Sequence, residues 1–477
     1  MDTKDNIIDI AKSQPFNSDQ EGCDKLQDIL NNPQHTDMGN AARLVKLYQD
    51  AIRWCPDFNH WLVWNGKYWE HDRRGKIFQA AQRTISNMII EAGAMETGRD
   101  RTALLKWAIQ SQAFSKVQSM VTMARYHEGI PILQEELDLD NEKLQLENGT
   151  LNLRSGDLLN FEQGDYITKT SPATYDSGAR APRWEQFLRE VMPDAETVDF
   201  LQRSVGYSLS GDVSARAFFV LYGLGRNGKS TFLSVVQHLL GDYACTTPVD
   251  TLMRKWGASA GGIPNDLAAL RGQRFVTAFE SGASMHLDEG KVKQMVGGDP
   301  ISARFMRAEF FTFMPAFKIF LCTNHKPVIR GVDAAIWDRI KLVPFNIRIT
   351  EAQEDTELKG KLLNELPGIL NWALQGYQNF KNFGLGACSE VVQATAAYRA
   401  DQDVIRSFLE QYYALDVASK VRSSQVYEDY KGWAEQEGEK IMSSSKLKAA
   451  LNDRGIRYKR ESDGRFYLGL MNKLEEV

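Results

Sequence analysis

A glycine-rich segment near the middle of the chain has the residue types and spacing of a phosphate-binding loop. It runs from Gly223 through four residues to Gly228, Lys229 and Ser230. Glycines let a loop bend tightly and point its N–H groups at phosphate oxygens, where side chains would otherwise intrude. In this pattern the lysine reaches the β- and γ-phosphates of a nucleotide and the serine hydroxyl holds Mg2+. The segment therefore predicts nucleotide binding and not an ordinary glycine-rich turn.

The residues around the loop predict the strand and helix that such a loop requires. The apolar run 218–222 predicts a buried strand, and a helical pattern continues to Leu240. The helix would present its N-terminus to the phosphates. We expect the nucleotide to contact Gly223, Gly225, Arg226, Asn227, Gly228, Lys229, Ser230 and Thr231.

Two further strand-like runs end in polar residues that can act on a bound nucleotide. The run 274–279 ends at Glu280, and the run 317–322 is followed by Asn324. An acid at the end of a strand beside the loop strand can reach the γ-phosphate side and, with Ser230, the metal. An apolar run ending in Glu is common, so the assignment of Glu280 rests on its position after the phosphate-binding loop.

Basic residues follow in places where they can meet nucleic acid or a neighbouring subunit. Lys293, Arg304 and Arg307 concentrate positive charge around a predicted hairpin with a basic tip. The alternative is a solvated helix face and a structural hairpin. Arg339 precedes a further strand, 340–345, and an arginine there can serve in trans, as arginine fingers do.

This ordered set resembles the superfamily 3 helicases, specifically the phage/plasmid primase-helicase family with its poxvirus relatives. The resemblance rests on GLGRNGKST, RFVTAFE, KVKQMVGGDPISAR, KIFLCTNHKP and GVDAAIWDRIKLVPF, about 130 residues in family order. Weaker similarity reaches back through NGTLNLRSGDLL and DYITKT, so roughly 40–477 is covered.

The resemblance implies a hexameric ring of AAA+-like modules that bind ATP and Mg2+ between subunits. It makes Lys229 and Ser230 the Walker A residues and Glu280 the Walker B acid, with Ser230 and Glu280 at the metal. Asn324 would be the sensor and Arg339 the finger to the neighbour's γ-phosphate. Lys293, Arg304 and Arg307 would contact DNA. Many family members carry adjacent acids where Phe279 precedes the single Glu280, which leaves open whether Glu280 serves metal, water or both.

The expected fold class is α/β, an AAA+-like P-loop motor between an N-terminal α+β domain and a C-terminal winged helix. The expected divisions are a flexible leader 1–35, a lead-in α+β domain 36–175, a helicase domain with helical collar 176–395 and a winged helix 400–477. About 35 residues before the lead-in domain are too few for a polymerase fold, so we expect no primase domain and no primer synthesis from this chain.

The terminal regions carry weaker signals. Asn65-Gly66 predicts a hairpin over 61–70, whose tryptophans are expected in a core instead of stacking on bases. Asp138 and Asp140 are expected in a solvated loop, because a polymerase-type metal site would need a third carboxylate. Predicted helices over 424–437 and 443–454 and a hairpin around Asp463-Gly464 give the order of a winged helix. Nine basic residues against three acids from 440 to 473 fit either DNA or protein docking.

Composition excludes several classes of protein. The 477 residues are 43% hydrophobic and 25% charged with a net charge of -5, which excludes wholesale disorder and uniform DNA coating. Five scattered cysteines without a CxxC pair indicate reduced thiols and not a disulfide or zinc scaffold. Because no signal peptide or apolar run of membrane length is evident, we expect a cytoplasmic protein without membrane contact.

These patterns together predict an ATP hydrolase that works as a replicative DNA helicase of a phage, plasmid or mobile element. It would be a homo-hexameric ring translocating on single-stranded DNA at forks, with a separate primase or polymerase as a further partner. The alternative is a nucleotide-driven initiator or loader that assembles on origin DNA without sustained unwinding.

Overall fold

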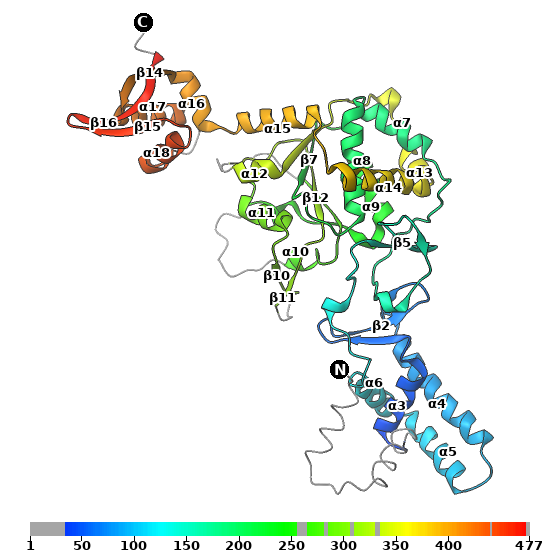
Figure 1. Cartoon of the computed structure of the whole chain (residues 1–477). Helices are drawn as coiled ribbons and strands as arrows, with labels where there is room; N and C mark the ends of the chain where they lie inside the picture. Colours follow the sequence, from blue (N-terminus) through cyan, green and yellow to red (C-terminus); the bar gives the residue numbers. More distant parts are fainter. Residues whose placement is uncertain are drawn as a thin grey trace. The chain divides into compact units, whose positions relative to one another are not determined.

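The computed structural model of the protein describes residues 34–254, 265–280, 285–305, 310–329, 334–438 and 441–473. The chain forms two compact units (Figure 1). The first ends at Asp140 and also takes in Leu159–Lys169, while the second contains Asn141–Leu158 and the chain from Thr170 onward. Residues 1–33 of the expected leader, Lys440 and Arg307 lie outside the described residues.

In the first unit, helices pack against a three-stranded antiparallel sheet of order β1-β2-β3. Asn65 Oδ1 accepts hydrogen bonds from the N–H groups of Lys67 and Tyr68 at 2.9 and 3.0 Å, which closes the turn between β2 and β3 and confirms the predicted hairpin. The elements are α3 (Asp37–Tyr48), β1 (Ile52–Cys55), β2 (His60–Trp64), β3 (Trp69–His71), α4 (Lys76–Ala94), α5 (Arg99–Ser111), α6 (Phe114–Ala124), η1 (Gln134–Glu136) and η2 (Gln163–Asp165).

Side chains of this unit that could suggest a nucleic-acid or metal site have structural roles. Trp54, Trp61 and Trp69 are buried in its apolar clusters, as predicted for a hairpin core. Asp138 accepts hydrogen bonds from the N–H and hydroxyl of Thr168 at 2.7 and 2.6 Å, so this carboxylate ties two loop segments together.

The second unit is built on a parallel five-stranded sheet of order β13-β7-β12-β9-β8, which confirms the α/β class. Four of the five strands were predicted and form within one residue of their expected limits, because strands buried on both faces appear as continuous apolar runs, whereas the short strand 244–246 was not predicted. The strands are β7 (Phe218–Tyr222), β8 (Ala244–Thr246), β9 (Phe275–Phe279), β12 (Lys318–Thr323) and β13 (Ile340–Pro344).

Helices cover both faces of this sheet (Figure 1). On one face pack α7 (Pro182–Val191), α8 (Ala195–Leu209), α9 (Lys229–Leu240) and α14 (Leu366–Phe383). On the other face pack α10 (Asn265–Ala268), α11 (Glu289–Gly297) and α12 (Ala334–Arg339). Helices α8 and α14 approach so closely that a Cβ added to Gly206 would lie 2.1 Å from the backbone nitrogen of Tyr377.

Two buried cations fix the amino ends of the central strands. Lys318 at the start of β12 donates to the carbonyls of Asp212 and Ala316 at 3.1 and 3.2 Å, and burial lowers its pKa well below the ordinary value for lysine. Arg274, just before β9, donates to the carbonyl of Lys143 at 2.7 Å. These bonds satisfy carbonyls that the neighbouring loops would otherwise bury without a partner.

The second unit also contains smaller elements that precede its C-terminal helices in the chain. They are β4 (Lys143–Leu146), β5 (Gly149–Asn152), β6 (Leu158–Leu159, where the two units divide), η3 (Gly241–Tyr243), η4 (Val249–Thr251), β10 (Ile301–Ala303), β11 (Phe311–Phe313), η5 (Glu351–Gln353) and α13 (Leu358–Leu363). No helix in the described part of the chain has the length and apolar character needed to cross a membrane.

Helix α15 (Ser389–Asp401) is tied to the loop that follows β12. Tyr398 donates its hydroxyl to the carbonyl of Pro327, and Asp401 accepts a bond of 3.0 Å from Lys326. Gln402 Oε1 accepts a 3.0 Å bond from the N–H of Ile329. These three bonds join the loop after β12 to the C-terminal end of α15.

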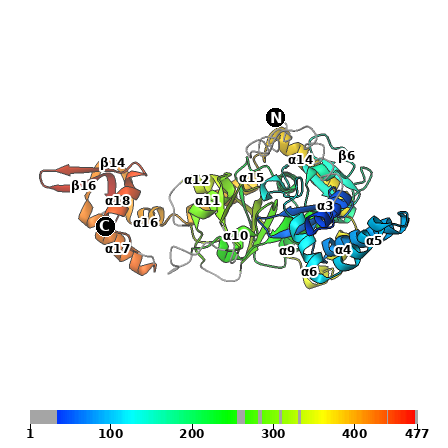
Figure 2. The ribbon, with the colours of Figure 1, turned by 90° about the horizontal axis from the view of Figure 1, so that it is seen from below.

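The C-terminal segment, which is residues 404–473, forms its own apolar cluster of helices and an antiparallel sheet of order β14-β16-β15 (Figures 1 and 2). The two helices and the hairpin expected here form, whereas β14 was not expected. The elements are α16 (Val404–Tyr412), β14 (Tyr413–Arg422), α17 (Ser423–Gln436), α18 (Ser444–Asn452), β15 (Arg457–Glu461) and β16 (Gly464–Asn472).

Candidate phosphate-binding site

The glycine-rich loop joins β7 to α9 at the carboxyl edge of the parallel sheet. Gly228, with φ of 84°, is the N-cap of α9, a left-handed conformation that costs glycine little. The next residue, Lys229, is the first of the helix, so its side chain and the free N–H groups of the first turn share one region. The strand, loop and helix stand in the order expected from the sequence.

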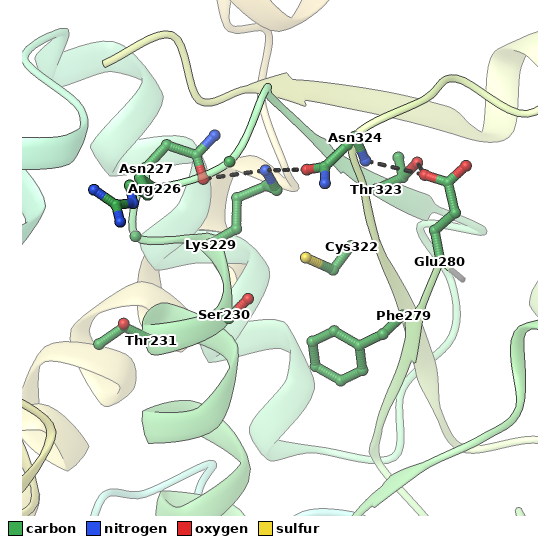
Figure 3. Close-up of a pocket in the computed structure, with 12 residues that line it drawn as sticks. Arg226, Asn227, Lys229, Ser230, Thr231, Phe279, Glu280, Cys322, Thr323 and Asn324 are labelled. Atoms are coloured by element: carbon green, nitrogen blue, oxygen red, sulfur yellow. Dashed lines mark hydrogen bonds between the residues drawn. The ribbon is translucent and has the colours of Figure 1, made fainter. Parts of the chain in front are cut away.

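One pocket of about 330 Å³ collects most of the predicted nucleotide and catalytic residues (Figure 3). It is large enough for a small ligand with several charged groups. Its lining comes from the loop and from the ends of β9 and β12, and consists of Gly225, Arg226, Asn227, Gly228, Lys229, Ser230, Thr231, Phe279, Glu280, Cys322, Thr323 and Asn324.

Lys229 supplies a buried positive charge that, among the described residues, hydrogen-bonds only to neutral oxygens. Its Nζ donates to the Gly223 carbonyl at 2.6 Å and to the amide oxygens of Asn227 and Asn324 at 3.1 and 3.3 Å. Its residue is 3% exposed, and burial lowers the pKa of its ammonium group. Because a buried cation among neutral dipoles lacks a full counter-charge, the surroundings of Lys229 suit an anion such as a phosphate.

Glu280 is held by donors that come from the end of β12. Glu280 Oε2 accepts hydrogen bonds from the N–H groups of Asn324 and His325 at 3.0 and 2.9 Å and from the hydroxyl of Thr323. Its carboxylate and the Ser230 hydroxyl line the same pocket, and such hard oxygen ligands suit Mg2+. The residues present therefore fit both a phosphate group and a divalent cation.

Asn324 links the two charged residues of the pocket (Figure 3). Its side-chain oxygen contacts Lys229, and its backbone N–H contacts Glu280. Sequence reasoning singled out Asn324 but missed Thr323. No local sequence signal could have found Thr323, because its place beside Glu280 follows from the pairing of Cys322 on β12 with Phe279 on β9.

Arg339, Lys293 and Arg304 do not line this pocket, whereas Gly223 contacts its lysine through the backbone carbonyl. Arg339 ends α12, where its Nη1 donates to the Ala335 carbonyl at 2.6 Å, and no residue in the described ranges bonds its buried Nε. Lys293 lies on α11. Arg304 follows β10 with its guanidinium 4.8 Å from the ring centre of Phe310, and β10 and β11 pair as the predicted hairpin.

Comparison with known proteins gives three family matches along the chain. Residues 41–193 match the family described as D5 N terminal like, and 400–456 match the family described as Poxvirus D5 protein-like. Between them, residues 221–339 match a family of unknown function.

Individual relatives match about half of the chain. "Putative helicase L207/L206" of Acanthamoeba polyphaga mimivirus is 29% identical over 266 residues, 52% of this chain and 28% of that protein. "Putative helicase 022R" of Frog virus 3 is 26% identical over 267 residues, 52% of this chain and 27% of that protein. The matched part is thus little more than a quarter of each relative's length. The solved C-terminal region of NrS-1 aligns with a TM-score of 0.49 and 8% identity over 90% of this chain and 98% of that chain.

The reactivity of the Cys322 thiol tests how deeply this side of the pocket is buried. Burial raises the pKa of this thiol, and its residue is only 8% exposed. Because the thiolate is the reactive form, a raised pKa leaves less of it near neutral pH. We expect iodoacetamide at about pH 7 to modify Cys322 more slowly than the partly exposed Cys245, as measured by peptide mass spectrometry. Equal rates at the two thiols would contradict the described burial.

Proposed function

We propose that this chain, which matches D5-like families over residues 41–193 and 400–456, is an ATP-dependent DNA helicase of a replication system. The pocket at the edge of the parallel sheet carries the proposal. A buried lysine, a serine at a helix N-terminus, a held carboxylate and a polar amide line it together. That combination serves nucleoside triphosphate hydrolysis better than simple storage of an anion, because binding alone would not need Glu280.

In this proposal the loop N–H groups and Lys229 hold the phosphates of ATP. Ser230 and Glu280 would hold Mg2+, which supplies positive charge for the bridging phosphate oxygens. Lys229 would exchange its neutral oxygen partners for phosphate oxygens. Glu280, kept in place from β12, would orient the attacking water and accept its proton. Asn324 would then respond to phosphate through its side chain while its N–H still contacts Glu280.

The motor would act as a homo-hexameric AAA+-like ring of superfamily 3 type. Arg339 would reach the γ-phosphate in the neighbouring subunit, which agrees with its position outside its own subunit's pocket. Lys293, Arg304 and Arg307 would contact the phosphates of a threaded single strand without reading its sequence. The C-terminal segment would be a winged helix. We place the protein in the cytoplasm with forked DNA and a separate primase or polymerase as partners.

Strand displacement on a forked duplex tests the function. We expect the wild-type chain to unwind with ATP and Mg2+, and Lys229→Ala to lose about a hundredfold or more in hydrolysis and unwinding, because a buried charge aimed at phosphate is removed. Lys361→Ala removes an exposed lysine of α13 and should leave both rates unchanged.

The same assay separates helicase from initiator. ATP-dependent DNA binding without unwinding over many turnovers would instead support an initiator or loader. If Lys229→Ala hydrolysed ATP normally, the pocket would not be the active site.

Thr323 is expected to act as a positioning residue for Glu280. Thr323→Val removes the hydroxyl at nearly constant volume, and loss of a hydrogen bond to a carboxylate costs about 1.5–3 kcal/mol, or about ten- to a hundredfold in rate. We expect kcat for ATP hydrolysis to fall by that factor while KM changes little, because Thr323 does not contact the ammonium of Lys229.

Thr323→Ser retains the hydroxyl and serves as the matched control. Its kcat should return close to the wild-type value. A purely structural role would instead lower the melting temperature and move KM with kcat in both variants.

Mixing inactive subunits tests the assignment of Arg339. Arg339→Ala and Lys229→Ala chains should each be inactive as pure rings. Mixed rings should regain ATP hydrolysis, because some interfaces join an intact Lys229 pocket to an intact Arg339. Full activity of Arg339→Ala alone would remove Arg339 from catalysis.

A further inference from the structure

The sheet of the C-terminal segment displays four basic residues on its outer face. In the register of the sheet, Lys420, Leu468 and Arg457 form one row across the three strands. A second row, two residues further along each strand, consists of Arg422, Phe466 and Lys459. Residues two apart on a strand point to the same side, so both rows share a face. We call Lys420, Arg422, Arg457 and Lys459 the basic face.

The opposite side of the same sheet is the side that packs on the helices. Val421, Tyr458 and Tyr467 form the row between the two basic rows, and all three belong to or pack against the apolar cluster of this segment. The basic face therefore points away from the helices. Arg422, Arg457 and Lys459 are exposed, and the Lys420 side chain is 45% exposed.

The middle of the basic face is covered by its own cations. Phe466 is only 5% exposed although it is not part of the apolar cluster. Lys420 Nζ lies 4.5 Å and Arg422 Cζ 5.6 Å from the centre of its ring. The aromatic ring thus holds two basic side chains over the sheet by cation–π contact and offers no free surface on which a base could stack.

Positive charge on this face is only partly neutralised within the segment. Glu461 is paired with Lys420, and with Lys459 at 3.1 Å. Both exposed arginines remain without an ion pair to any residue in the described ranges. Arg460 and Arg465, which pair at the hairpin end, lie on the other side of the sheet and are not part of the basic face.

The spacing of the four cations suits a repeating polyanion. Positions two apart along a strand are about 6.7 Å apart, and strands separated by one strand are about 9.5 Å apart. A single phosphate is too small to approach all four groups, whereas nucleic acid carries charges along a line. The absence of an exposed ring at the centre of the face argues against a stacked single strand.

From these observations we propose that the basic face of the C-terminal segment binds the phosphate backbone of duplex DNA. Contact would be independent of sequence, because phosphates carry no base identity. The interaction uses neither the nucleotide pocket nor ATP. In this proposal the sheet contacts the DNA. The alternative would be insertion of α18 into a groove of the duplex.

The test measures duplex binding by the full chain without nucleotide over a range of salt concentrations. Arg457→Gln combined with Lys459→Gln removes two phosphate contacts. We expect the slope of log affinity against log salt to become shallower by about 1.8, and affinity at low salt to fall. Lys431→Gln with Lys446→Gln removes the same charge from α17 and α18 and should leave the slope unchanged.

Further measurements distinguish loss of a DNA contact from loss of folding. They also distinguish binding to duplex DNA from binding to other polyanions. Arg457→Lys with Lys459→Arg keeps both charges and should bind like the wild type. Unchanged ATP hydrolysis and melting temperature in the glutamine variant would show that the chain still folds. A wild-type slope in that variant, an equal loss in the α17/α18 control, or an equal loss of binding to single strands or polyglutamate would overturn the proposal. A chain without any helicase activity could still pass this test.

Discussion

The carboxyl ends of β7, β9 and β12 meet at one edge of a parallel sheet, and the candidate site depends on that alignment. Leu321 on β12 lies between Val220 of β7 and Ala278 of β9. All three strands then end at nearly the same level, which brings a loop, an acid and an amide together from segments some 50 residues apart. A shift of one residue in any pairing would turn these side chains to the other face of the sheet.

Within this site the positive and negative groups do not pair with each other. Lys229 is held by neutral oxygens and Glu280 by N–H and hydroxyl donors, with Asn324 taking part in both sets. A direct ion pair would have to be broken, at the cost of leaving charges buried, before a phosphate could enter. Neutral partners can be exchanged for phosphate oxygens at lower cost, while the carboxylate keeps its orientation.

Much of the central sheet could be predicted because buried parallel strands have a simple signature. The runs that end at Tyr222, Glu280 and Asn324 were recognisable from apolar residues followed by polar ones. Strand β14 was not, since its exposed alternation with charged residues gives little contrast with a loop. The partners of Thr323 and the burial of Lys318 depend on which strands lie side by side, and strand order is not written in any local pattern.

The site residues also differ in whether local sequence alone could predict them. The loop motif is local and could be found from spacing, whereas the contact between Thr323 and Glu280 joins positions that only the sheet brings together. Single basic residues such as Lys293 and Arg304 can be assigned to DNA only by their place in a family order, because an exposed cation has no local signature of its purpose.

Helix α15 gives the end of β12 a mechanical connection to the rest of the chain. Tyr398, Asp401 and Gln402 bond the loop immediately after Asn324 and His325. That loop cannot shift far unless these three bonds break or the last turn of α15 moves with it. Because α16 begins three residues after α15 ends, the hydrogen bonds that hold the loop after β12 lie next to the start of the C-terminal segment in the chain.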